Sequence, residues 1–144
     1  MPPEGLRPGL TPGLRHSITI PVDEALAVPA QGVLLGFANS MPPVFATAWM
    51  IALAEWTCVA ALAPHLAPNQ RTVGTRVEMS HIAATPIGML VTAAVELVEA
   101  DGRRLRFHVS CRDEVEPIGE GFHERMIVDH DRFLARLAPK RGAR

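Results

Sequence analysis

The residue with the clearest potential for chemistry is Glu55, the single charged residue in the twenty-residue segment VFATAWMIALAEWTCVAALA (44–63). Its neighbours one helical turn away are all apolar: Ile51, Ala52, Cys58 and Val59. A lone carboxylate in such surroundings either takes up a proton or finds a partner. A partner for Glu55 is therefore expected elsewhere in the chain.

His81 is the first candidate partner. The segment RTVGTRVEMSH (71–81) alternates as a strand does, which places one set of side chains on the inward face: Val73, Thr75, Val77, Met79 and His81. A glutamate on a helix and a histidine on a strand can then point into the layer between helix and sheet. Such a pair is either a satisfied core pair or part of an active site, where perturbed ionisable groups gather.

Thr47 is the third residue of interest. Eight residues separate it from Glu55, which is about 12 Å along a straight helix, so the two side chains cannot touch. They can line two ends of one small-substrate site. Thr47 is also suited to cap the helix, because a threonine hydroxyl accepts from the free amides of a first turn.

Composition excludes several classes of function. The formal net charge of −1 and a pI of about 6.6 give no sign of a nucleic-acid surface. Segment 44–63 is long enough to span a bilayer, but no Lys/Arg cluster flanks it closely, so a buried core helix is favoured and no membrane partner is expected. The six histidines show no metal-ligand spacing, so no metal is expected.

The two cysteines and the N-terminus indicate the compartment. Cys58 and Cys111 both lie in apolar patterns, which is typical of buried free thiols in a reducing compartment. The start of the chain, MPPEGLRPGLTPGLR, has no apolar signal core. A cytoplasmic location is therefore expected.

The helix and strands that must position these residues are predicted from the spacing of apolar residues and from the prolines and glycines that interrupt it. A short strand (16–22) and a loop-like stretch (23–43) precede the helix, which prolines at 64 and 68 end. Four strands follow: 71–81, 88–100, 103–112 and 117–129, with Asp101-Gly102 as a hairpin turn. In the last strand, one alternating set is apolar (Ile118, Phe122, Met126, Val128) and the other contains Gly119, Gly121, His123 and Arg125.

One helix on one antiparallel sheet of about five strands is an α+β architecture. We expect a flexible N-terminal arm (1–14), one domain (15–136) and a flexible basic tail (137–144). A helix that is apolar on all sides needs more cover than one sheet provides. The stretch 23–43 or a second copy of the chain must supply it, and a homodimer is expected.

Four stretches of the chain resemble one known family when they are taken together. They are VFATAWMIALAEWTCVAALAPHLAP, VGTRVEMSHIAATPIGM, DGRRL and IGEGFHER, with similar spacing over roughly 42–128. In this combination the chain resembles hotdog-fold thioesterases of the fluoroacetyl-CoA thioesterase type. The resemblance implies a long central helix wrapped by a curved antiparallel sheet, with sites at a dimer interface.

The resemblance also implies roles for individual residues. Thr47, Glu55 and His81 match the catalytic set of the family, Gly74 matches a glycine near the acyl group, and Arg125 matches an arginine. Glu55 would attack the thioester or orient water, because a desolvated carboxylate is a stronger base or nucleophile than a hydrated one. His81 would move the proton or polarise the carbonyl. CoA would be part of the substrate, and no separate cofactor is expected.

The segment before the helix departs from the family. The fluoroacetyl-specific member carries a phenylalanine lid there, whereas this chain reads GFANSMPPVF (36–45). Ala38 and Met41 take the nearest positions, with Phe37 as a possible substitute. The implied function is therefore hydrolysis of a small acyl-CoA thioester with an open choice of acyl group. A non-catalytic acyl-binding module and a hotdog hydratase or dehydratase are the alternatives, because fold alone does not separate them.

Overall fold

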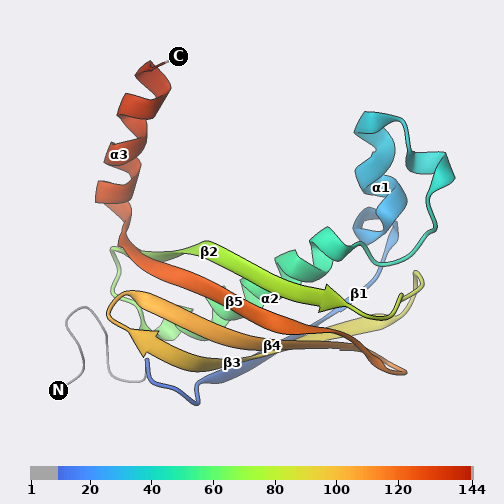
Figure 1. Cartoon of the computed structure of the whole chain (residues 1–144), viewed down its shortest axis with the longest axis horizontal. Coiled ribbons are helices and arrows are strands. Elements are labelled where there is room, and N and C mark those ends of the chain that lie inside the picture. Colours follow the sequence, from blue (N-terminus) through green and yellow to red (C-terminus); the bar gives the residue numbers. More distant parts are fainter. Residues whose placement is uncertain (1–9, 144) are drawn as a thin grey trace.

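The computed structural model describes residues 10–143, and within them five strands form one antiparallel sheet in the order β1-β3-β4-β5-β2 (Figure 1). The strands are β1 (Arg15–Pro21), β2 (Gln70–His81), β3 (Leu90–Asp101), β4 (Arg104–Asp113) and β5 (Pro117–Asp129). Gly102 has a φ of 60°, as the predicted turn requires. The predicted α+β architecture is confirmed, and β1 and β2 are the two edges of the sheet.

The long helix α2 (Thr47–Leu62) lies across one face of this sheet and fills the core. Met50, Leu53 and Cys58 on its inner face pack with buried residues of β3, β4 and β5, such as Leu97, Phe107 and Ile118. The helix is shorter than the predicted 44–63, because residues 44–46 are extended and bridge to neighbouring loops. The segment Thr47–His65 is long and apolar enough to cross a membrane, but here it forms a helix with one face in the protein core.

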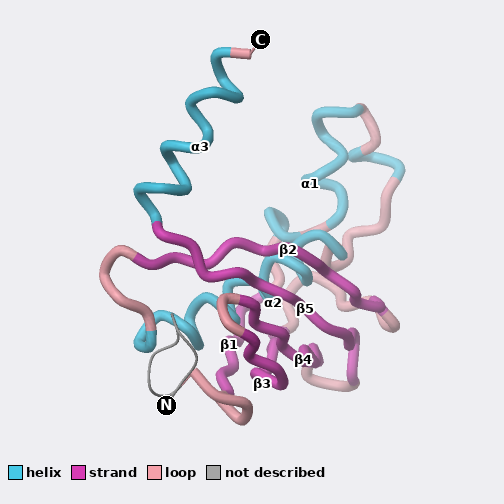
Figure 2. Tube along the Cα trace, turned by 60° about the vertical axis from the view of Figure 1, so that its left-hand side comes forward, coloured by secondary structure: helices cyan, strands magenta, loops and turns pink. Residues whose placement is uncertain are grey.

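The opposite face of α2 is uncovered. Trp49 is 39% exposed and Trp56, two turns later, is 67% exposed. The stretch 23–43, predicted as loop-like, instead forms short helical turns: η1 (Glu24–Leu26), α1 (Val28–Gly32), η2 (Val33–Leu35) and η3 (Ala38–Ser40). They form a lobe that projects beside the start of α2 (Figure 2) and leaves both tryptophans exposed.

The simple alternation predicted for β2 is wrong in its first half. The pairing of β2 with β5 shifts in register between Gly74 and Arg76, as in a β-bulge. Gly74 therefore faces α2, as do Met79 and His81 after the bulge, whereas Thr75 does not. A one-residue insertion reverses which set of side chains faces inward.

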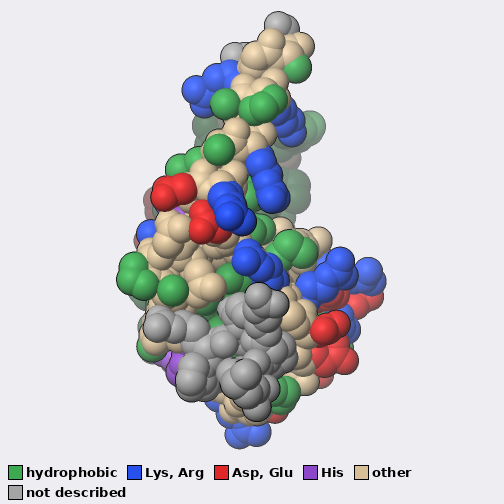
Figure 3. Space-filling view, turned by 90° about the vertical axis from the view of Figure 1, so that its left-hand side faces the viewer, with side chains coloured by type: hydrophobic (Ala, Val, Ile, Leu, Met, Phe, Trp, Pro, Cys, Tyr) green, Lys and Arg blue, Asp and Glu red, His purple; other side chains and the backbone are tan. Residues whose placement is uncertain are grey.

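The two ends also differ from the sequence-based expectation. Leu10 is buried in the core and the amide of Gly13 donates to the carbonyl of Leu97, so the last part of the predicted arm is packed against the domain. Residues 1–9 of that arm lie outside the described residues. At the other end, helix α3 (His130–Gly142) replaces most of the predicted tail. Asp129 caps it, and it extends away from the sheet with basic and apolar side chains on its surface (Figures 1 and 3).

Candidate active site

Glu55 lies over Gly74, where α2 crosses β2. A Cβ atom at position 74 would be 3.1 Å from Glu55 Oε1 and 3.2 Å from His123 Cε1. The absence of a side chain on Gly74 therefore leaves the space that these groups occupy. The Glu55 side chain is 38% exposed in the single chain, so one side of the carboxylate contacts the sheet and the other is open.

Two buried residues of β5 lie behind Glu55. Arg125 is 7% exposed and His123 only 1%. The guanidinium of Arg125 donates from Nε to Thr72 Oγ1 (2.8 Å), from Nη2 to Thr72 O (2.9 Å) and from Nη1 to His123 Nε2 (3.1 Å). His123 Nε2 lies 3.9 Å from Glu55 Oε1. A cation and an imidazole are thus held next to the carboxylate.

Burial lowers the pKa of His123, and the adjacent Arg125 lowers it further. Burial also lowers the pKa of Arg125, which the charge of Glu55 partly offsets. A guanidinium keeps its proton at neutral pH even so. The site therefore contains a neutral His123 and a charged Arg125 beside Glu55.

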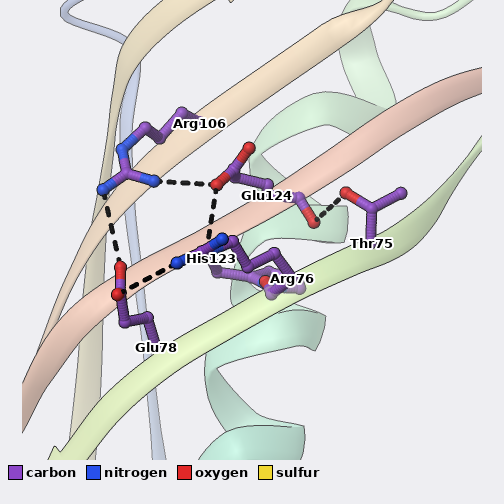
Figure 4. A network of polar contacts seen from close by, with 6 residues as sticks. All are labelled: Thr75, Arg76, Glu78, Arg106, His123 and Glu124. Atoms are coloured by element: carbon purple, nitrogen blue, oxygen red, sulfur yellow. Dashed lines mark hydrogen bonds and ion pairs between the residues drawn. The ribbon is translucent and has the colours of Figure 1, made fainter.

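The bulge of β2 supplies the other contact of His123. Its Nδ1–H donates to the carbonyl oxygen of Arg76 (2.8 Å), while the Arg76 side chain lies on the outer face of the sheet. There Arg76 and Arg106 form ion pairs with Glu78 and Glu124 (Figure 4). Thr75 Oγ1 also donates to the carbonyl of Glu124 at 3.2 Å. Contacts on both faces of the sheet thus hold the bulge.

The second group of candidate residues lies at the N-terminal end of α2, about two turns before Glu55. Thr47 Oγ1 and His81 Nδ1 are 2.8 Å apart and share a hydrogen bond. The prediction that Thr47 caps the helix is wrong, because Ala46 is the N-cap residue and no side chain caps this helix. His81 Nε2 is buried and has no hydrogen-bond partner among residues 10–143. Burial lowers the pKa of His81, which favours a neutral ring.

Glu55 and His81 do not meet within one chain. Among residues 10–143 no hydrogen bond or ion pair joins them, and the nearest ionisable partner of Glu55 is His123. Because Glu55 lies at Gly74 and Thr47 at His81, α2 and β2 run in opposite directions and keep the two groups about two helical turns apart. The predicted pairing of Glu55 with His81 is wrong for the single chain.

A groove of about 660 Å³ opens beside Glu55. Trp56 and Val59 of α2 line one side, and Arg71, Thr72 and Arg125 line the other. Phe37 and Met41 are not part of its wall; they lie in the lobe near the start of α2, 59% and 44% exposed. No group of three potential metal ligands occurs among the described residues. The groove can receive a small apolar group next to a carboxylate and a cation.

Sequence reasoning missed His123 and Thr72 as parts of this site. One signal could have found His123. It belongs to the same alternating set as Gly119, Gly121 and the candidate Arg125, and the structure places that set toward α2. On the outer face, Phe122 lies under the guanidinium of Arg106, at 4.2 Å.

The architecture and the position of Glu55 define a class. A single long helix across an antiparallel five-stranded sheet, with a carboxylate on the helix at the sheet's edge, is the hotdog arrangement of thioesterases. A structure from Thermus thermophilus, a thioesterase superfamily member, shares this fold with a TM-score of 0.82 and covers 95% of this chain and 99% of its own, although only 24% of residues are identical.

More specific similarities lie within this class. The family model for fluoroacetyl-CoA-specific thioesterases matches residues 28–131. A fluoroacetyl-CoA thioesterase from Streptantibioticus cattleyicolor is 45% identical over 102 residues, 71% of this chain and 73% of the relative. A crystal structure of the fluoroacetyl-CoA thioesterase FlK has a TM-score of 0.88 and 38% identity, covering 92% of this chain and 98% of that one. The chain belongs to the fluoroacetyl-CoA-specific thioesterase family, and the predicted class, a hotdog-fold thioester hydrolase, is confirmed.

Proposed function

We propose that this thioesterase hydrolyses small acyl-CoA thioesters, and that Glu55, His81 and Thr47 carry out the reaction in a site built by two copies of the chain. The observation that carries the proposal is the separation of the site within one chain. Glu55 lies in the middle of α2, and the Thr47–His81 pair lies at its N-terminal end. The Glu55 side chain is 38% exposed, and His81 Nε2 lacks a hydrogen-bond partner among the described residues.

The free edge of β2 supports a twofold arrangement. Within the described chain β2 pairs only with β5, so its other edge offers unpaired backbone groups. If two β2 strands pair antiparallel about an axis between Val77 and Glu78, Gly74 of one chain lies opposite the partner's His81. Glu55 would then approach the partner's Thr47–His81 pair. The exposed Trp49 and Trp56 would be covered in the same assembly.

Glu55 has the surroundings that a nucleophile or general base requires. His123 Nε2 lies 3.9 Å from the inner side of the carboxylate, Arg125 lies beside His123, and Glu55 lines the groove. Glu55 would either attack the thioester carbonyl or take a proton from an attacking water. Backbone amides near Gly74 would stabilise the developing oxyanion.

His81, oriented by Thr47, would give a proton to the leaving thiolate or polarise the carbonyl oxygen. With Nδ1 bonded to Thr47, the unpartnered Nε2 of His81 is the atom free to exchange a proton with substrate. A ring that is neutral at pH 7 can act in this way, and burial lowers the pKa of His81. Thr47 fixes the orientation of the ring.

The acyl-CoA substrate is supported by the relatives. Structures of FlK variants have been solved in complex with fluoroacetate and CoA, at 39% identity, and with acetyl-CoA, at 37% identity. For this chain we propose a CoA thioester of a short acyl group, with no separate cofactor and in the cytoplasm. The lobe that carries Phe37 and Met41 would close the entrance at the Thr47 end.

A direct assay tests this proposal. Purified protein is incubated with acetyl-, propionyl- and fluoroacetyl-CoA, and the free thiol and the carboxylic acid are both measured. Release of both products in equal amounts is expected. Binding without release would indicate the acyl-binding module, and turnover of an enoyl-CoA to a hydroxyacyl-CoA with the thioester intact would indicate a hydratase.

A further inference from the structure

We infer that His123 is a positioning residue, which holds the guanidinium of Arg125 against Glu55 through its Nε2 atom and thereby fixes the carboxylate for the reaction. The kinetic part of this inference rests on the proposed function. The contact itself is a property of the fold and can be tested separately.

The hydrogen bonds of His123 determine its protonation. A carbonyl oxygen only accepts, so Nδ1 must carry the proton that it donates to the carbonyl of Arg76. A guanidinium only donates, so Nε2 must present its lone pair to Nη1 of Arg125. The ring is therefore neutral with its proton on Nδ1, and each nitrogen has one defined partner.

Arg125 depends on this acceptor for its orientation. Thr72 holds the Nε and Nη2 side of the guanidinium through its hydroxyl and its carbonyl. Among described residues, His123 supplies the hydrogen bond to Nη1, which is the side that faces Gly74 and Glu55. Without His123 the guanidinium loses its acceptor on the side nearest the carboxylate.

His123 also couples Glu55 to the bulge of β2. The same ring contacts the Arg76 carbonyl in the bulge and lies 3.9 Å from Glu55 Oε1. The bulge is held on the outer face by the ion pairs of Arg76 with Glu78 and Glu124 (Figure 4). Gly74, next to the bulge, is positioned by the same contacts.

Burial and the charge of Arg125 lower the pKa of His123 and favour the neutral ring, whereas the charges of Glu55 and Glu124 act in the opposite direction. Arg125 faces it from the same strand, Glu55 from α2, Glu124 is adjacent on β5, and Cys58 of α2 is near Arg125. Protonation would place an Nε2–H against the Nη1–H of Arg125 and break that contact. Activity should therefore fall on acidification as His123 takes up a proton.

Two substitutions separate the two contacts of His123. In His123→Gln the side-chain oxygen takes the place of Nε2 and can still accept from Arg125. In His123→Asn the side-chain amide takes the place of Nδ1 and can still donate to the Arg76 carbonyl. His108 on β4, which is 37% exposed and bonded to Glu120, provides the matched control, His108→Gln.

The kinetic test compares kcat and KM of these variants with a short acyl-CoA. We expect His123→Asn to lose about tenfold to a hundredfold in kcat with little change in KM, the range for a lost hydrogen bond to a charged group. His123→Gln should regain most of that loss and lack the His123 contribution to the acidic fall in the pH profile, while the contribution of His81 remains. His108→Gln should match the wild type. Equal activity of the Gln and Asn variants, or the reverse order, overturns the inference.

A spectroscopic test does not depend on activity. In ¹⁵N-edited NMR spectra the Arg125 Nη1–H protons, which donate to His123, should give a slowly exchanging signal in the wild type and in His123→Gln, and lose protection in His123→Asn. If the three proteins show this pattern of protection but the wild type has no thioesterase activity, the proposed function is rejected and the His123–Arg125 arrangement is retained. Equal protection in all three proteins would reject the arrangement.

Discussion

At the scale of single residues, the surroundings of Glu55 are set by β2 and β5 beneath it rather than by its apolar neighbours on α2. The sequence pattern predicts that Glu55 needs a partner, but it cannot identify that partner. The bulge in β2 moves Gly74 to the inner face, and the polar set of β5 brings His123 and Arg125 beneath it. Neither effect is visible in an alternating pattern, because a bulge changes which side chains face inward without changing the residues.

Replacing Glu55 by glutamine tests its chemical role. We expect turnover to fall at least about a hundredfold, which corresponds to about 2.7 kcal/mol in the activation barrier. The melting temperature should hold or rise, because the side chain is 38% exposed and contributes little packing. Initial rates and thermal unfolding of the same preparation provide the measurement. An active Glu55→Gln enzyme with a destabilised fold would mean that Glu55 is a structural residue.

Replacing Gly74 by alanine tests the space beneath the carboxylate. The new methyl group would be 3.1 Å from Glu55 Oε1 and 3.4 Å from Arg125 Nη1, so these groups must shift by a few tenths of an ångström. A displacement of this kind in a site costs activity before it costs stability, and we expect kcat/KM to fall about tenfold or more. Gly142→Ala, where the added Cβ meets nothing within 4 Å, is the control. Unchanged kinetics of Gly74→Ala would contradict the proposed position of Glu55.

At the scale of elements, the strands and the central helix could be predicted because their patterns are long and regular. Helix α3, which Asp129 caps, could not be predicted, because Pro139 and a basic, polar composition are typical of a flexible tail. The short helices within 23–43 could not be predicted either, because they are too short to show a helical period and because their prolines and glycines are typical of a loop. The lobe that these turns form carries the residues expected to act as a lid.

The lobe should set the range of acyl groups that the enzyme accepts. It presents Phe37 and Met41 exposed, with Ala38, Asn39 and Ser40 between them, and a flexible methionine fills space without fixing its shape. One small substituent in an apolar pocket is worth only about 1 to 3 kcal/mol. We therefore expect acetyl- and propionyl-CoA to be hydrolysed within about a hundredfold of fluoroacetyl-CoA.

Competition assays with the three thioesters measure this range directly. Met41→Phe should narrow it if the lobe acts as a lid. A preference of the wild type for fluoroacetyl-CoA of many thousandfold would show instead that Phe37 restores an aromatic closure.

At the scale of the whole molecule, the single chain leaves its catalytic candidates apart and its helix half covered. Trp56 is 67% exposed, and the free edge of β2 runs alongside the groove that contains Glu55. Single-chain sequence patterns predicted that further cover was needed. In the proposed dimer the same cover would bring the two halves of the site together, which patterns in one chain cannot predict because it depends on a symmetry axis between chains.

Mixing two inactive variants tests this assembly. We expect the wild type to sediment as a dimer, and Glu55→Gln and His81→Asn to be inactive alone. After subunit exchange, half of the dimers would be mixed and one of their two sites would be intact, which gives about 25% of wild-type activity. Subunit exchange with no recovery would place the whole site in one chain, and a monomeric sedimentation mass at micromolar concentration would exclude the dimer.

The two buried cysteines have a consequence for how this enzyme can be observed. Burial raises the pKa of Cys58 to about 12 and of Cys111 to about 11, so almost no thiolate is present near pH 8. A colorimetric disulfide reagent will therefore react with the liberated CoA and spare the folded catalyst, which gives the assay a low background. Once the chain unfolds, both sulfur atoms become accessible. The same dye then counts denatured molecules, two equivalents for each, so a late rise in signal records loss of enzyme rather than turnover.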